Sequence, residues 1–285
     1  MRFSNYWNES VLFEDKRFSD WEQYQNRSPE LKAAVEVLKK LEAVRGLEHE
    51  PKAYVVGGAV RDIVLGKDLP DDVDIATNVP IDEVEQMFDA YDIGKNKEFG
   101  IVVIKHGGYD FEVANFRQDG AYEDGRHPDD VKIVIDFKDD ASRRDLTINA
   151  MAIDKDGNII DYFDGTKDIK DKLIRTVGDP EKRFKEDYIR MLRAPRFAAR
   201  FGFDVDPKTA NAIRKHSAKL EEEPPPRLYK EIVKMAREEG SKFADAIIMM
   251  KDFGLLQHIL PEVVKMDEFY HSLDHHPEGV YVERL

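Results

Sequence analysis

The sequence contains no cysteine among its 285 residues, which excludes disulfide bonds and cysteine-based zinc sites. It also lacks a long apolar run, because the longest, residues 244–250, is far shorter than a membrane span requires. The first residues mix aromatic and charged side chains and show no apolar core of a secretion signal. These absences predict a cytoplasmic protein with no membrane partner.

An excess of positive charge is absent as well, because 58 acidic residues against 44 basic ones give a formal net charge of −14. A general binder of polyanions would show the opposite balance. Nucleic acid is not excluded, since the local charge of the contact face decides such binding. Two basic islands, residues 143–145 and 190–200, stand out in the acidic chain.

The apolar pattern changes twice along the chain. Residues 1–28 show no clear period and are interpreted as an extension, whereas 28–44 predict an amphipathic helix with Ser28 as its N-cap. Residues 51–165 alternate strands with helices, which is typical of an α/β or α+β domain. From about Asp168 onward strand patterns vanish and helices follow. The elements predicted in the alternating part are strands at 53–58 and 72–77, helices at 59–66 and 81–91, and a hairpin at 100–116.

Two carboxylates, Asp72 and Asp74, stand one residue apart on a predicted strand, so their side chains point the same way. They repel each other unless a cation lies between them. A bare pair of this kind is more often a solvated acidic turn. Here, however, the Gly57-Gly58 turn ends the preceding strand and Arg61 begins the next helix, which suits a phosphate. The pattern therefore indicates Mg²⁺ shared with a nucleoside triphosphate.

Further polar residues could complete such a site. Glu112, on the second strand of the hairpin, is either an ordinary exposed residue or a third carboxylate of a two-metal site. Asp145 is predicted to cap a helix, with Asn149 four residues on. In a functional interpretation, Arg144 contacts phosphate or ribose, and Asp145 or Asn149 contacts sugar hydroxyls.

Asp187 and Arg190 are three residues apart on a predicted helix and would share a face, with Arg193, Arg196 and Arg200 as a nearby stripe. The simpler interpretation is a surface ion pair. Alternatively, a carboxylate that accepts and a guanidinium that donates hydrogen bonds match an amino group next to a ring nitrogen. Cytosine and adenine present that pattern, and a hydrogen-bonding site rejects bases that lack it. The pair would thus select CTP and ATP.

Seven stretches in this order resemble the successive motifs of the bacterial-type (class II) CCA-adding enzymes and poly(A) polymerases. The resemblance runs from about Tyr54 to Phe203 and continues weakly through the later helices. Any one motif is weak, whereas seven in order are highly specific. The stretches are VVGGAVRDIVLG, DVDIAT, FRQDGAYEDGRHP, RRDLTINAMAID, DYFDGTKDI, IRTVGDP and EDYIRMLRAPRFAARFGF.

The resemblance implies an α+β protein with a DNA-polymerase-beta-like nucleotidyltransferase head followed by an all-helical neck and body. It implies addition of C, C and A to tRNA 3′ ends from CTP and ATP with Mg²⁺, and a flexible loop at 119–128. The expected divisions are an extension and helix at 1–50, the head at 51–165, the neck at 166–223 and the body at 224–285.

The resemblance also implies residue roles. Asp72 and Asp74 are expected to hold the metals, with Glu112 as the further carboxylate. Base reading is expected of Asp187 and Arg190, with Arg193 and Arg196 beside them. The expected nucleotide-binding residues in the head are Gly57, Gly58, Arg61, Arg144, Asp145 and Asn149.

Some residues depart from the family pattern. Pro195 falls inside a predicted helix, where it removes a backbone donor and is expected to produce a kink. His271, His275 and His276 resemble the entry to a phosphohydrolase domain but are interpreted as a solvated segment. An apparent calcium loop at 154–165 is better explained by a hairpin turn at its glycine.

Several functions remain open. Within the class, the alternatives are a CC-adding, an A-adding or a poly(A) enzyme. An RNA-binding relative with weakened catalysis is a different class, and a small-molecule nucleotidyltransferase is disfavoured because the helical part would have no RNA to bind. The oligomeric state is not determined by the sequence.

Overall fold

The computed structural model describes Phe18 and residues 21–67, 72–91, 96–120, 131–238 and 240–265. Most of the predicted loop at 119–128 and the three terminal histidines lie outside these described residues, as does most of the extension at 1–28. Residue contacts divide the chain into unit 1, residues 1–120 and 129–169, and unit 2, residues 121–128 and 170–285.

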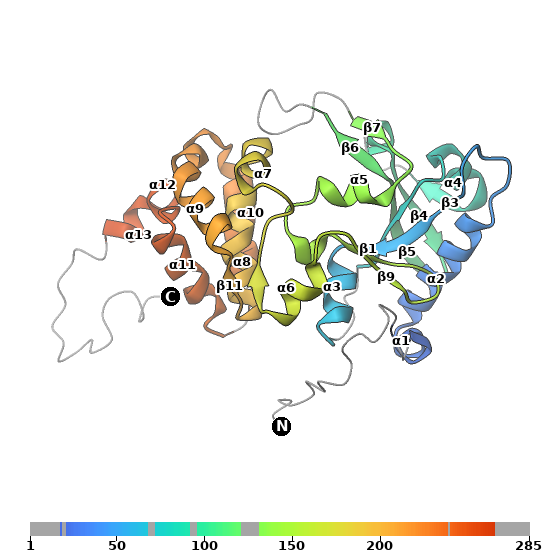
Figure 1. Cartoon of the computed structure of the whole chain (residues 1–285), viewed down its shortest axis with the longest axis horizontal. Coiled ribbons are helices and arrows are strands. Elements are labelled where there is room, and N and C mark those ends of the chain that lie inside the picture. Colours follow the sequence, from blue (N-terminus) through green and yellow to red (C-terminus); the bar gives the residue numbers. More distant parts are fainter. Residues whose placement is uncertain are drawn as a thin grey trace. The chain divides into compact units, whose positions relative to one another are not determined.

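Unit 1 is built on a seven-stranded sheet with the order β3-β4-β5-β2-β1-β8-β9 (Figure 1). The β2–β5 pair is parallel and the other neighbours are antiparallel. A separate antiparallel pair joins β6 to β7. The strands are β1 Ala53–Val56, β2 Asp74–Thr77, β3 Asp89–Tyr91, β4 Ile101–His106, β5 Tyr109–Asn115, β6 Arg117–Asp119, β7 Val131–Ile133, β8 Met151–Ile153 and β9 Ile159–Asp161.

Helix α2 covers part of the sheet with an apolar face. Leu31, Leu38 and Leu41 recur at helical spacing and are fully buried, so this face packs against β1, β2, β4 and β5. The Ser28 side chain accepts the Leu31 N–H at 3.1 Å, which confirms the predicted cap. The helices of unit 1 are α1 Trp21–Arg27, α2 Pro29–Glu42, α3 Gly58–Val64, α4 Ile81–Met87, α5 Phe137–Ser142 and α6 Gly165–Lys170, with 3₁₀ turns η2 Asn96–Phe99 and η3 Thr147–Asn149.

Two predictions for unit 1 need correction. The helix predicted at 81–91 ends at Met87, because Phe88 is extended and β3 then pairs with the edge of β4. Part of the extension that shows no period in the sequence forms a helix, α1, whose Trp21 is buried. In both places contacts with distant residues decide the structure, whereas the predicted hairpin of β4 and β5 is confirmed.

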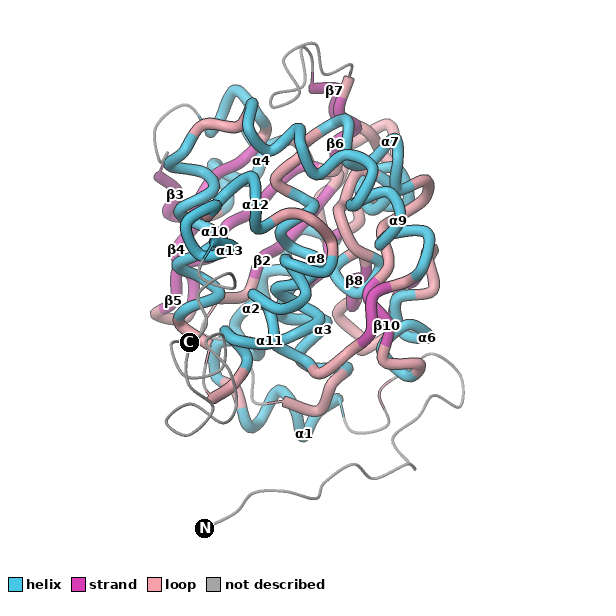
Figure 2. Tube along the Cα trace, turned by 90° about the vertical axis from the view of Figure 1, so that its left-hand side faces the viewer, coloured by secondary structure: helices cyan, strands magenta, loops and turns pink. Residues whose placement is uncertain are grey.

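Unit 2 is mainly helical (Figure 2). The prediction that strands end near Asp168 is wrong in one detail, since β10 Leu173–Ile174 pairs in parallel with β11 Asp204–Val205. Helix α8 continues through Pro195 and ends at Gly202, which is left-handed with φ 67°. The helices are α7 Pro180–Glu186, α8 Arg190–Phe201, α9 Pro207–His216, α10 Pro225–Ala236, α11 Lys242–Asp252, α12 Leu256–Ile259 and α13 Pro261–Lys265, with the 3₁₀ turn η4 Ser217–Glu222.

Candidate active site

Three carboxylates lie on or next to two neighbouring strands in unit 1, one of them within β5. Asp74 is the first residue of β2, and Asp72 precedes it. The parallel register pairs Ile75 with Val113, so Asp74 and Glu112, each one residue earlier, lie at the same level of the sheet. Glu112, which the sequence offers either as an ordinary exposed residue or as a third carboxylate, lies on the strand beside Asp74, and its part in a metal site stays a prediction.

The electrostatics of Asp74 reflect this crowding. Burial, followed by the charges of Asp72 and Glu112, raises the pKa of Asp74 to about 6, while the Arg144 guanidinium acts in the opposite direction. In the described part of the chain, Asp74 makes no ion pair that would neutralise it. A divalent cation would relieve the repulsion, so these residues fit a metal bound through oxygen ligands.

The carboxylates do not form a complete metal cage. Among the described residues, no three acidic or histidine side chains are arranged to hold an ion by themselves. Mg²⁺ is usually bound by one or two carboxylates together with waters and substrate phosphates, so an incomplete cage suits an ion that arrives with a nucleotide.

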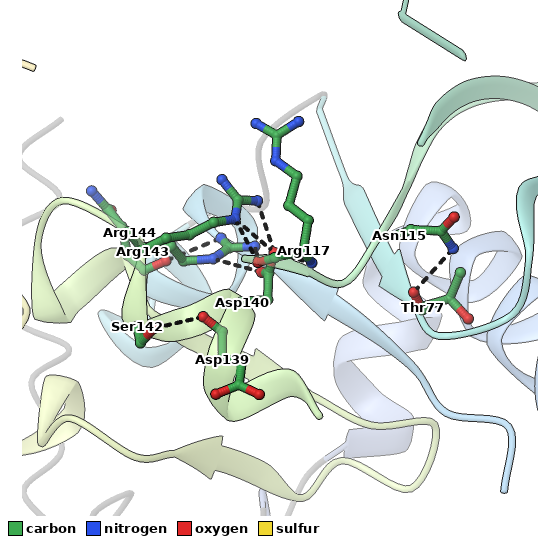
Figure 3. Close-up of polar contacts among 9 residues, drawn as sticks. Thr77, Asn115, Arg117, Asp139, Asp140, Ser142, Arg143 and Arg144 are labelled. Atoms are coloured by element: carbon green, nitrogen blue, oxygen red, sulfur yellow. Dashed lines mark hydrogen bonds and ion pairs between the residues drawn. The ribbon is translucent and has the colours of Figure 1, made fainter. Parts of the chain in front are cut away.

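Arg144 provides the positive charge beside this cluster. Gly57, which ends β1 with φ 73°, leaves room for it: a Cβ there would lie 3.4 Å from Arg144 Nη1 and 3.8 Å from Asp74 Oδ2. Arg144 Nε and Nη2 donate to Asp140 Oδ2 at 3.3 and 3.0 Å, and Nη1 donates to the Asn149 carbonyl at 3.3 Å. Figure 3 shows Arg144 extended along the Asp140 carboxylate. The guanidinium is therefore fixed at the edge of the acidic cluster.

Arg61 lies in a buried network below this edge. It is 5% exposed, and its guanidinium donates to both oxygens of Asp62 and, at 2.7 Å, to Asn149 Oδ1. A Cβ on Gly58 would lie 3.5 Å from Arg61 Nη2, which is ordinary contact distance. These contacts give Arg61 a structural role, and the nucleotide-binding roles of Arg61 and Gly58 stay predictions.

Asp145 is not the helix cap that the sequence predicts. The turn η3 has Leu146 at its N-cap position, without a side-chain hydrogen bond. Asp145 Oδ1 instead accepts from the Asn149 amide at 3.4 Å, because the turn is a short 3₁₀ segment that brings the two side chains together. Asn149 consequently contacts Arg61, Arg144 and Asp145 at once. Contact of Asp145 or Asn149 with a nucleotide stays a prediction.

In unit 2, Asp187 and Arg190 do not share a helical face as predicted. Helix α7 ends at Glu186, Asp187 is extended with φ −161°, and α8 begins at Arg190. Asp187 Oδ2 accepts from Arg227 of α10 at 2.9 Å, while Arg190 Nη1 donates to Glu186 Oε2 at 2.7 Å. Each member of the predicted pair therefore has an ionic partner of its own at the α7–α8 junction.

Arg193 and Arg196 occupy different environments on α8. Arg196 is 6% exposed, stacks 4.1 Å from the Phe197 ring centroid and forms an ion pair with Glu231 of α10 at 3.0 Å. Arg193 is half-buried, 5.7 Å from the same ring centroid. Arg196 thus joins α8 to α10, and base recognition by either arginine stays a prediction.

Four residues of the two sites were missed in the sequence. Asp140 lies three and four residues before Arg143 and Arg144, a helical spacing that could have revealed it. The spacing of Glu186 and Arg190 gives the same signal. Arg227 and Glu231 also form local ion pairs with Glu223 and Lys234. Nothing local links them to Asp187 and Arg196, because these partners lie 40 and 35 residues away.

Comparisons with known proteins identify relatives of this chain. Residues 53–175 match the poly A polymerase head domain, and residues 202–266 match the probable RNA and SrmB-binding site of polymerase A. The CCA-adding enzyme of Bacillus pumilus is 49% identical over 169 residues, which are 59% of this chain and 42% of the relative. The chain spans about half the length of the curated relatives it matches.

Two solved structures are similar in fold and sequence. The CCA-adding enzyme of Bacillus stearothermophilus in complex with CTP has a TM-score of 0.70 and 35% identity, covering 81% of this chain and 54% of that one. A tRNA nucleotidyltransferase complexed with a primer tRNA and an incoming ATP analogue has a TM-score of 0.63 and 29% identity, covering 87% of this chain and 72% of that one.

The fold comprises a poly A polymerase-type head domain followed along the chain by helices, which confirms the predicted α+β class. The chain belongs to the bacterial-type family of CCA-adding enzymes and poly(A) polymerases. No helix within the described ranges is both long and apolar enough to cross a membrane.

Proposed function

We propose that this chain transfers nucleotides from CTP and ATP to the 3′ end of tRNA without a template, as a CCA-adding enzyme. The observation that carries the proposal is the cluster of Asp72, Asp74 and Glu112 with Arg144 at its edge, in a chain of this family. Similar structures are named for CTP and for a primer tRNA with an ATP analogue, which supports these substrates.

In this proposal the residues of unit 1 bind and orient the triphosphate. Asp72 and Asp74 would hold Mg²⁺, which when bound lowers the pKa of the attacking 3′-hydroxyl and neutralises the leaving oxygens. Glu112 adds negative charge on the neighbouring strand. Arg144, at the edge of the cluster, would contact the phosphates, and Gly57 would allow the chain to approach them. The α-phosphorus is thereby presented to the hydroxyl in line, and pyrophosphate leaves.

Base choice is assigned to the α7–α8 junction of unit 2. The Asp187 carboxylate would accept a hydrogen bond from the exocyclic amino group of cytosine or adenine, and Arg190 would donate one to the adjacent ring nitrogen. Arg227 and Glu186 hold these two side chains in the structure without a base. We therefore infer that both partners orient the reading groups and that Arg193 and Arg196 support the same helix.

The predicted division into an extension, head, neck and body at 1–50, 51–165, 166–223 and 224–285 is retained as part of this proposal. The division of contacts after residue 169 supports a separate helical part. A cytoplasmic location is retained as well, from the cysteine-free sequence.

The test is an incubation of the protein with Mg²⁺, CTP and ATP on three RNAs, followed by sequencing of the products. The RNAs are a tRNA that lacks its CCA end, the same tRNA ending in CC, and an unrelated RNA. Addition of CCA to the first RNA supports the proposal. Products that stop at CC, addition of A only to the CC end, or long A tracts on any RNA would instead identify the CC-adding, A-adding or poly(A) alternatives.

The controls separate chemistry from base choice. Asp74→Asn should nearly abolish incorporation of every nucleotide, because it removes a metal ligand. Asp187→Asn and Arg190→Met should relax selectivity for CTP and ATP over UTP and GTP more than they slow transfer. Absence of incorporation by the unaltered protein despite retained tRNA binding would favour the catalytically weakened relative.

A further inference from the structure

A buried carboxylate outside the predicted site connects two arginines. Asp140, on α5, is 1% exposed. Its Oδ1 accepts from Arg143 Nη2 and Nε at 2.7 and 3.0 Å, and from the backbone N–H of Arg117 at 3.3 Å. Its Oδ2 accepts from Arg144 Nη2 and Nε (Figure 3). Each oxygen thus holds a different guanidinium.

Asp140 carries its charge at neutral pH. Burial by itself would raise the pKa of this carboxyl, but Arg144 and Arg143 outweigh burial and hold the pKa below its ordinary value. A buried charge of this kind is tolerated only when it is paired and its lone pairs are satisfied, as they are here. The charge is therefore a fixed feature of the fold around Arg144.

Arg144 is placed beside the acidic cluster without pairing to it. Nη1 and Asp74 Oδ2 both approach the point where a Cβ on Gly57 would lie, at 3.4 and 3.8 Å. Yet among the described residues its ion pair is with Asp140, and none joins it to Asp74. A flexible cationic side chain next to a group of carboxylates is attracted to their negative charge. The hydrogen bonds to Asp140 and to the Asn149 carbonyl oppose that attraction.

We propose that Asp140 is a positioning residue that keeps Arg144 from ion-pairing with the acidic cluster of Asp72, Asp74 and Glu112. The cluster then stays available to a divalent metal, and Arg144 stays available to the triphosphate that the metal accompanies. This inference rests on the proposed function, because it assigns the phosphate contact to Arg144. The chemistry recognised is a metal-bound nucleoside triphosphate.

Arg143 supplies a matched control. It shares the Asp140 carboxylate, and its Nε also donates to the backbone carbonyl of Arg117 at 3.2 Å. Loss of its guanidinium therefore disturbs the same buried ion-pair network while Arg144 keeps its bonds to Asp140. The variants Asp140→Asn and Arg143→Met should both lower the melting temperature, whereas only the first releases Arg144.

The experiment measures binding without RNA and without turnover. ATP binding is titrated by calorimetry at several Mg²⁺ concentrations, and Mn²⁺ binding is followed by electron paramagnetic resonance. D140N should weaken ATP binding about 10-fold and raise the metal concentration for half-saturation by a similar factor, which is typical for loss of an orienting partner. R143M should leave both quantities within about two-fold of the unaltered protein.

Two results would overturn the proposal: a folded D140N protein that binds ATP and Mn²⁺ like the unaltered one, or D140N and R143M weakened equally. If D140N does not fold, Asp140→Glu is measured instead, since it keeps the charge and moves the carboxylate by one methylene. The Asp140→Glu variant should bind ATP more weakly than R143M. Equal ATP binding by the two would contradict the role of Asp140 in positioning Arg144. Failure of the unaltered protein to bind ATP with metal would refute the proposed function itself. Equal binding by the two variants would refute only the positioning role of Asp140.

Discussion

Replacement of Asp74 by asparagine should stabilise the metal-free protein while it removes activity. The pKa of Asp74 is raised from 3.8 to about 6, first by burial and then by Asp72 and Glu112. Because a tenfold change in a proton-binding constant corresponds to about 1.4 kcal/mol, the ionised carboxylate costs the folded state roughly 3 kcal/mol at most. The cost is absent below the unfolded pKa and is fully present above the folded pKa. Asp74→Asn should therefore raise the free energy of unfolding at pH 8 by about 1–3 kcal/mol.

The assay is urea unfolding of both proteins in a metal chelator at pH 8 and at pH 4. The difference should shrink toward zero at pH 4, where Asp74 is largely protonated in the folded protein. Mg²⁺ with ATP should stabilise the unaltered protein more than the variant, because only the former keeps both ligands. A variant that is equally stable or less stable at pH 8 without metal would refute the view that the carboxylates repel one another.

Three further substitutions test the supporting structure by calorimetric or urea unfolding. Gly165→Ala should cost about 1–3 kcal/mol, because its Cβ would clash with the Thr147 carbonyl oxygen at the turn η3; an unchanged stability would contradict that packing. Glu231→Gln should cost about 3–5 kcal/mol, since it removes the negative charge that pairs with the buried Arg196 guanidinium, and a neutral result would show that other contacts hold α8 to α10. Trp21→Ala should cost about 3–5 kcal/mol, and no loss would mean that the amino-terminal helix is not docked.

Much of the fold could be predicted because its signals are local. The cap at Ser28 and the spacing of buried leucines predict α2 within a few residues. The Gly107-Gly108 turn, with both residues at positive φ, fixes the hairpin of β4 and β5. The order of seven motifs identified the family, and the spacing of Asp72 and Asp74 indicated a metal site. Each of these depends on residues that are neighbours in the chain.

Other features were decided only when distant segments packed together. The helix predicted at 81–91 stops at Met87 because the edge of β4 offers hydrogen bonds to the residues that follow. Asp187 takes Arg227 as its partner across 40 residues, a pairing that no local pattern contains. The sequence by itself determined which charged side chains are available, and it predicted which of them could bind a metal, a phosphate and a base. The tertiary structure decided which charges meet, because ion pairing depends on burial and on distances that packing alone sets.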